Sequence, residues 1–124
     1  MNKKVYTDKA PAAIGPYSQA IISGNLLFCS GMMPVDPHTN ALVENDVVVQ
    51  SKQIMKNIDA LLKEAGYTVD DVVKTTCFLA DIADFGAFNE VYGEFFTSKP
   101  ARSCIAAKDL PKGALVEVEI IASK

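Results

Sequence analysis

The sequence is poor in the residues that build metal centres and disulfide frameworks. It has no tryptophan, one histidine and three cysteines in 124 residues. Cys29, Cys77 and Cys104 are far apart and form no C-x-x-C pair, so neither a disulfide framework nor a zinc knuckle is indicated. The lone histidine, His38, cannot build a usual metal site. We therefore expect no metal and no cofactor, and the free thiols favour a reducing compartment, most simply the cytosol.

Long apolar runs, basic stripes and phosphate-binding loops are missing as well. No apolar stretch reaches the ~20 residues that a membrane-spanning helix needs, and residues 1–7 lack the apolar region of a signal peptide. Twelve Lys and Arg residues against 15 Asp and Glu give a formal net charge of -3, which argues against nucleic acid as a partner. No G-x-G-x-x-G or P-loop motif supports nucleotide binding. We expect a cytoplasmic protein without nucleic-acid or membrane partners.

The residues that are present predict one folded domain over residues 1–124, since 49% are hydrophobic and 22% charged. Apolar periodicity and turn residues predict a helix over 46–65, begun by Asn45 or Asp46 and ended at Gly66, and a second helix over 84–96 capped by Asp84. Alternation and β-branched residues predict five strands. These strands cover residues 20–22, 26–29, 72–80, 102–107 and 115–122, with a loop around Pro34, Pro37 and Asn40.

This order of elements predicts an α/β or α+β sandwich in which two helices cover one face of a sheet. In the last strand Val116, Val118 and Ile120 form one apolar face by the period of two. The opposite face carries Glu117 and Glu119 between aliphatic residues. A mixed face of this kind suits a subunit interface with polar pockets better than open solvent.

Three polar side chains near the end of the chain are candidates for chemistry. Arg102 opens a strand beside small residues and can present its planar fork to a carboxylate, or it is a surface arginine in an ordinary ion pair. Glu117 can act as a general base if burial raises its pKa, or it is one of two solvated carboxylates with Glu119. Cys104 shares the face of Arg102 and is a nucleophile only if His38 or a cation activates it; otherwise it lines a pocket or the core.

Four further residues are weaker candidates, each with an ordinary structural alternative. Tyr17 can stack on a ligand or pack with its hydroxyl at the surface. Ser30 and Gly31 follow a strand, where a glycine lets the backbone approach a ligand or marks a bulge. Asn89 lies among aromatic residues on the second helix, either as a ligand contact or as a surface amide.

Taken together, these segments resemble the RidA/YjgF family of reactive-intermediate deaminases over essentially the whole chain. The order and spacing of the motifs are more specific than any single one of them. The matching motifs are Ala-Pro-Ala-Ala-Ile-Gly-Pro-Tyr-Ser-Gln at 10–19, Phe-Cys-Ser-Gly at 28–31, Val-Lys-Thr-Thr at 73–76, Asp84-Phe85 with Asn89 and Tyr92, Phe95-Phe96, Pro-Ala-Arg-Ser-Cys at 100–104, Leu-Pro-Lys at 110–112 and Val-Glu-Val-Glu at 116–119.

The resemblance implies a chorismate-mutase-like α+β fold, a mixed sheet with two helices on one face, and a homotrimer with sites in the clefts between subunits. It implies hydrolysis of 2-iminobutanoate and 2-iminopropanoate, and of their enamine tautomers, to 2-oxo acids and ammonia. These imines escape from pyridoxal-phosphate-dependent dehydratases. The family's carboxylate-binding arginine falls on Arg102 and its water-activating glutamate on Glu117. Its pocket-lining positions fall on Tyr17, Ser30, Gly31, Asn89 and Cys104.

Two departures from the family pattern bear on substrate preference. Met32 stands where the family commonly has glutamine, and the loop at residues 97–99 is short. Two alternative functions stay open. One is a non-enzymatic trimer that binds 2-oxo acids as a regulator or chaperone, which a retained Glu117 disfavours. The other is an RNA-acting translation inhibitor, which the acidic balance and the lack of a histidine-based catalytic set disfavour.

Overall fold

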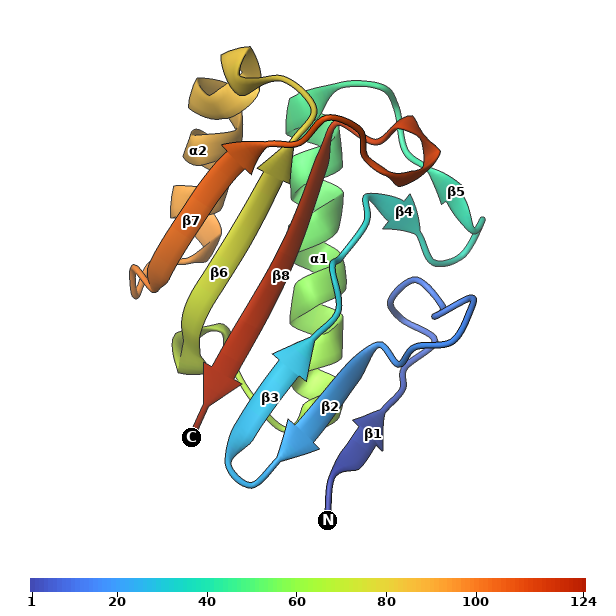
Figure 1. The fold of residues 1–124 in the computed structure, drawn as a ribbon, viewed down its shortest axis with the longest axis vertical. Helices are drawn as coiled ribbons and strands as arrows, with labels where there is room; N and C mark the ends of the chain where they lie inside the picture. Colours follow the sequence, from blue (N-terminus) through green and yellow to red (C-terminus); the bar gives the residue numbers. More distant parts are fainter.

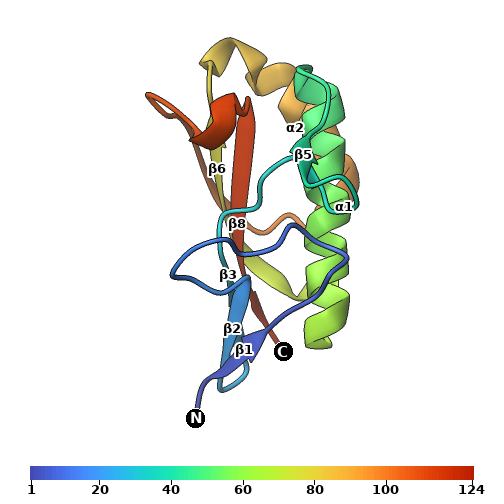
Figure 2. The ribbon, with the colours of Figure 1, turned by 90° about the vertical axis from the view of Figure 1, so that its right-hand side faces the viewer.

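A six-stranded sheet forms one layer of the molecule, and two helices form the other. The computed structural model describes residues 1–124, and Figure 1 shows the strand order β1-β2-β3-β8-β6-β7. Neighbouring strands are antiparallel except for β6 and β7, so the sheet is mixed. The strands are β1 (Lys3–Val5), β2 (Ala20–Ser23), β3 (Leu26–Cys29), β6 (Val72–Leu79), β7 (Ala101–Ala106) and β8 (Val116–Ser123). Figure 2 shows both helices on the same side of this sheet, as predicted.

The long helix α1 (Val47–Ala65) confirms the prediction for residues 46–65. The side chain of Asp46 accepts hydrogen bonds from the backbone N–H groups of Val48 and Val49, which would otherwise lack a partner. Gly66 ends the helix with φ +83°, a left-handed conformation that glycine adopts without a steric penalty. The apolar stripe of the helix is buried against the sheet.

The second helix, α2 (Phe85–Phe95), begins differently from the prediction. Asp84 makes no side-chain cap, because it belongs to a short 3-10 helix (Ile82–Asp84) that runs directly into α2. The capping carboxylate belongs instead to Asp81, which accepts a hydrogen bond from the N–H of Ala83 at 2.9 Å. The aromatic residues of α2 pack as expected, with Phe88 fully buried.

Three short strands were not predicted. β1 is only three residues long and has no hydrophobic period, and it is held by its pairing with β2. The expected loop around Pro34 contains a small separate hairpin, β4 (Val35–Asp36) and β5 (Ala41–Leu42). Asn57, buried on α1, donates hydrogen bonds from its amide to the backbone oxygens of Met33 at 3.1 Å and Val35 at 2.9 Å, and so fixes this loop against the helix.

The two faces of the sheet have different surroundings. Val116, Val118 and Ile120 of β8 point toward the helices and are fully buried, as predicted. The other face is not covered by any element of the chain (Figures 1 and 2) and exposes apolar side chains. These are Phe28, Val73 and Ile105, which are 42%, 48% and 53% exposed. No helix of the chain combines the length and the apolar character needed to cross a membrane.

Candidate functional site

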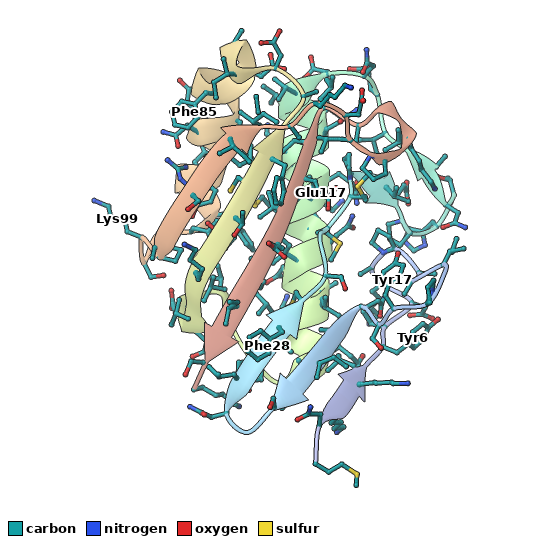
Figure 3. The ribbon with its side chains drawn as sticks, viewed as in Figure 1. Tyr6, Tyr17, Phe28, Phe85, Lys99 and Glu117 are labelled. Carbon is teal, nitrogen blue, oxygen red and sulfur yellow. The ribbon has the colours of Figure 1, made fainter.

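A cavity of about 680 Å³ lies where β8 begins. Its walls come from the N-terminal segment before β2, the segment that follows β3, and the 3-10 turn Pro111–Gly113 before β8. Four of the predicted site residues line it: Tyr17, Ser30, Gly31 and Glu117. Glu117 points from β8 out of the uncovered face of the sheet, while Tyr17 lies in the neighbouring loop (Figure 3). Segments distant in sequence therefore converge at one cavity.

Glu117 has the electrostatics expected of a general base. Partial burial raises the pKa of its carboxyl, and the negative charge of Glu119 on the same face raises it further. The partial burial on which the prediction depended is present, and its effect on the pKa has the expected direction; the role of Glu117 as a base stays a prediction. Glu117 has no ion-pair partner, because the single salt bridge of the chain joins Lys63 and Asp59. The carboxylate is therefore free to hold a water molecule or a proton of a ligand.

The side chain of Glu117 explains why a glycine stands at position 31. A methyl group at Gly31 would overlap the carboxylate of Glu117, so only glycine lets the carboxylate lie against the backbone after β3. The close approach at Gly31 is that of a protein side chain, and a ligand contact at this glycine stays a prediction. The absence of a side chain at Gly31 thus leaves room for the Glu117 carboxylate in the cavity.

Ser30, Tyr17 and Gln19 line the same cavity as Glu117. The hydroxyl of Ser30 donates to the backbone oxygen of Ser18 at 2.6 Å, which fixes the two sides of the cavity together. Tyr17 is 53% exposed, which disfavours the alternative of a packed tyrosine with only its hydroxyl at the surface. The side-chain oxygen of buried Gln19 accepts a hydrogen bond from the N–H of Thr7. Its side-chain nitrogen donates to the backbone oxygens of Thr7 and Pro11. It holds the N-terminal segment over the cavity.

Some residues of the cavity wall, among them Gln19 and Lys112, had no predicted role. Gln19 and Lys112 both line the cavity, and both lie in motifs that carry the family resemblance. Lys112 has φ +60°, a left-handed conformation uncommon for residues other than glycine. The Leu-Pro-Lys-Gly order signals a turn, but it does not reveal that the turn borders a cavity.

Arg102 lies on the other face of the sheet, at the edge formed by β7. Its Nη1 donates to Oδ1 of Asn89 at 2.6 Å. Its guanidinium lies 4.6 Å from the ring centroid of Tyr92 and 5.4 Å from that of Phe85. Such stacking stabilises a cation and keeps the guanidinium plane in one orientation. Arg102 is in no salt bridge, which removes the surface ion pair as an explanation.

Cys104 shares the helix-facing side of β7 with Arg102, as predicted from its spacing. It is partly exposed, and burial raises its pKa while the charge of Arg102 lowers it. His38 is exposed in the turn between β4 and β5 and lines no part of the cavity. Figure 1 places that turn and β7 at opposite edges of the molecule, so the structure forms no Cys–His pair. No cluster of three or more His, Cys, Asp or Glu side chains is arranged to hold a metal ion.

The predicted site residues therefore form two groups on opposite faces of one chain. In the sheet register Arg102 pairs with Thr75, which in turn pairs with Ile120. Thr75 and Ile120 are buried under the helices, so Arg102 lies on the helix-facing side as well. Glu117 pairs with Phe78, which pairs with Ile105 on the uncovered face. The cavity group consists of Tyr17, Ser30, Gly31 and Glu117, and the edge group consists of Asn89, Arg102 and Cys104. The structure of one chain does not bring these two groups together.

Both departures from the family pattern lie close to these groups. Met32 is buried, lines the cavity, and exchanges two backbone hydrogen bonds with Val118 at 2.7 and 3.2 Å. Its side chain is thus part of the cavity's apolar support. The short loop at 97–99 is closed by a hydrogen bond from the N–H of Lys99 to the oxygen of Phe96, with Lys99 at φ +56°. It leads directly into β7 and the edge group.

Known proteins match this chain over its whole length. A family model described as endoribonuclease L-PSP matches residues 7–124. A RutC family protein of Pyrococcus horikoshii is 48% identical over 100% of this chain and 99% of that protein. The solved structure of YyfA from Yersinia pestis, of the conserved Rid protein family, is 47% identical with a TM-score of 0.97 and full coverage of both chains. That of E. coli TdcF with bound serine is 40% identical, with a TM-score of 0.93 and 98% coverage of each chain. The mixed sheet with two helices is thus shared with solved structures.

Proposed function

This chain belongs to the RidA/YjgF family, and from that membership we propose that it hydrolyses 2-imino acids to 2-oxo acids and ammonia. The proposed substrates are 2-iminobutanoate, 2-iminopropanoate and their enamine tautomers. The observation that carries the proposal is Glu117, an unpaired and half-buried carboxylate with a raised pKa inside a cavity. Hydrolysis of an imine needs such a base, an anchor for the substrate carboxylate and little else.

Arg102 is the proposed anchor. Asn89 occupies one guanidinium nitrogen, and the Tyr92 ring supports the guanidinium plane, so the remaining N–H groups can donate to both oxygens of a carboxylate. Because the chain supplies no carboxylate partner, the anion of a ligand would meet an uncompensated positive charge. A small carboxylate ligand fits the E. coli relative, whose structure holds serine.

Glu117 is the proposed base toward water. A protonated imine carbon is already electrophilic, so a water molecule held by Glu117 can add to it while its proton passes to the carboxylate. The resulting carbinolamine takes this proton from Glu117 on its nitrogen. As the C–N bond breaks and ammonia leaves, the carbinolamine hydroxyl gives its proton to the Glu117 carboxylate, which leaves the 2-oxo acid. The raised pKa of Glu117 makes it a stronger base than an ordinary carboxylate, and no covalent nucleophile is needed.

We further propose that the complete site forms between copies of the chain in a homotrimer, with the edge group of one copy facing the cavity group of another. Two observations support this arrangement. Arg102 and Glu117 lie on opposite faces of one chain, so a single copy does not present both to one substrate. The uncovered face also exposes Phe28, Val73 and Ile105, whose burial against another copy would be favourable.

Semicarbazone formation from the imine released by a threonine dehydratase tests the activity, measured with and without this protein. We expect acceleration by the wild type and none by Arg102→Ala. No acceleration by the wild type would overturn the proposed reaction. If the wild type instead bound a 2-oxo acid through Arg102 without turnover, the chain would be a ligand-binding protein.

Mixing two inactive variants tests the shared site. Arg102→Ala and Glu117→Gln each lack one group, and co-refolding them in equal amounts would place an intact Arg102 opposite an intact Glu117 at about a quarter of the sites between copies. We expect partial recovery of activity in the mixture and none in either variant refolded alone. A mixture as inactive as its components would show that each site is built within one chain.

A further inference from the structure

Two of the three cysteines face each other across neighbouring strands. In the parallel pairing of β6 with β7, Cys77 is the direct partner of Cys104. Neighbouring strands lie about 4.7–4.9 Å apart, which falls inside the Cα separation of about 4.4–6.8 Å that a disulfide spans. Cys29 differs, because its partner in the sheet is Ala20. We propose that Cys77 and Cys104 form a redox-sensitive dithiol that hydroperoxides convert into a disulfide joining β6 to β7.

Both thiols lie on the helix-facing side of the sheet and influence each other. Cys77 is fully buried, with its sulfur 3.9 Å from the hydroxyl oxygen of Thr75, whereas Cys104 is partly exposed. The Cys77 side chain lowers the pKa of Cys104, and the Cys104 side chain raises that of Cys77, as expected for neighbouring thiols. β7 is an edge strand paired only with β6, so a small shift that closes the sulfur–sulfur distance disturbs no third strand.

The positions of the thiols assign their roles in the reaction. Burial raises the pKa of Cys77 to about 12, so it stays protonated at neutral pH. Cys104 is more exposed and lies beside Arg102, whose positive charge lowers its pKa against the effect of burial. The Cys104 thiolate is therefore the group that an entering hydroperoxide meets first.

The reaction balances with a hydroperoxide as the oxidant. The Cys104 thiolate attacks one peroxide oxygen and the O–O bond breaks, which gives a sulfenic acid and an alkoxide or hydroxide that takes up a proton. The sulfur of Cys77 then attacks the sulfenic sulfur, loses its proton and displaces water. Two thiol hydrogens are removed, and the peroxide is reduced. This inference is independent of the proposed imine hydrolysis, since its readout is the covalent state of the cysteines.

The rate of oxidation follows the ionisation of Cys104. The titratable and charged groups that act on it are Arg102 on its own strand, Cys77 on β6 and Tyr92 on α2. Burial is the largest influence and raises the pKa of Cys104, so the thiolate fraction at neutral pH is small. We expect slow oxidation at neutral pH and progressively faster oxidation as the pH rises.

The experiment treats the folded protein with hydrogen peroxide, alkylates the remaining thiols under denaturing conditions, and measures intact and peptide masses. In the wild type we expect one alkylated cysteine, Cys29, the loss of two hydrogens, and a Cys77–Cys104 peptide that dithiothreitol separates. Cys29→Ala is the matched control, since it removes a buried cysteine and should still form the disulfide.

Cys77→Ala separates the dithiol from simple oxidation of Cys104. Without its partner, Cys104 should gain oxygen atoms and form no link within the chain. If wild-type Cys104 also gained oxygen while Cys77 remained alkylatable, the dithiol would be ruled out. A link between chains in place of the internal one would equally overturn it. Cys77→Val serves the same comparison if the alanine variant is unstable, because it fills more of the buried volume.

Discussion

The edge group on β7 and the cavity group around Glu117 hold opposite charges by different means. Arg102 is supported by an amide oxygen and two aromatic rings, which stabilise its charge without neutralising it. Glu117 is destabilised as an anion by burial and by Glu119, and Gly31 leaves room for its carboxylate. Neither charge has a counter-ion in the chain. A charge of the first kind can bind an anion and one of the second kind can take up a proton, and the proposed hydrolysis of imino acids requires both.

The largest expected effect comes from Glu117→Gln, which keeps the shape of the cavity group and removes its base. General-base catalysis contributes roughly 10²–10⁴-fold, and we expect kcat to fall by that order in the dehydratase-coupled assay. Ligand binding at the edge group should persist, because Arg102 is unchanged. Glu119→Gln is the matched control on the same strand face and should retain most of the activity. Comparable losses in both variants would contradict the assignment of the base to Glu117.

Arg102→Ala should be nearly as damaging, through the edge group. Removing one partner of a hydrogen-bonded charge pair costs about 2–5 kcal/mol, and the loss should appear in kcat/KM. Arg102→Lys keeps the charge but not the planar fork, so we expect intermediate activity. Binding of a 2-oxo acid, measured by calorimetry, should weaken in the same order. Full binding by the alanine variant would remove Arg102 from the site.

How far these two regions follow from the sequence depends on the range of the interactions involved. The stripe of α1, its cap at Asp46 and the shared face of Arg102 and Cys104 follow from local periodicity, and all are confirmed. The strands β1, β4 and β5 were missed because two or three residues have no period. The loop containing β4 is fixed by Asn57, whose partners lie 22 and 24 residues away.

The separation of the two groups was harder to predict than the groups themselves. Alternation shows that Glu117 and Glu119 share a face, but it does not show where Arg102 lies relative to them. β7 reads Ala-Arg-Ser-Cys-Ile-Ala, without a clear apolar side, so only its pairing with β6 reveals that Arg102 faces the helices. The need for glycine at position 31 depends on Glu117, 86 residues later in the chain, and no local pattern encodes that contact.

Gly31→Ala tests whether the position of the Glu117 carboxylate in the cavity group matters, without removing a functional group. The added methyl group would displace the Glu117 carboxylate, and a misplacement of about 1 Å costs on the order of 10²-fold in rate. Gly86→Ala is the control, since a methyl group there meets nothing within 4 Å. We expect it to keep full activity. Wild-type kcat in Gly31→Ala would show that the exact carboxylate position is unimportant.

Asn89→Ala tests the support of the edge group and should have a smaller effect. It removes the acceptor of the 2.6 Å bond from Arg102 while the stacking on Tyr92 remains. A hydrogen bond to a charged group contributes about 1.5–3 kcal/mol, and the exposed position of Asn89 favours the low end, roughly tenfold. The loss should appear mainly in KM. Glu90→Ala, the exposed neighbour on α2, should leave KM unchanged.

The smallest effect concerns stability. Because the pKa of Glu117 is raised in the folded chain, its contribution to stability is fully present below pH 4.5 and is lost as the pH rises through the folded pKa. At neutral pH the ionised carboxylate therefore opposes folding. Thermal unfolding should show Glu117→Gln to be more stable than the wild type at pH 7, with a gap that narrows as the pH falls. A wild type that is the more stable protein at pH 7 would contradict a raised pKa of Glu117 in the folded protein.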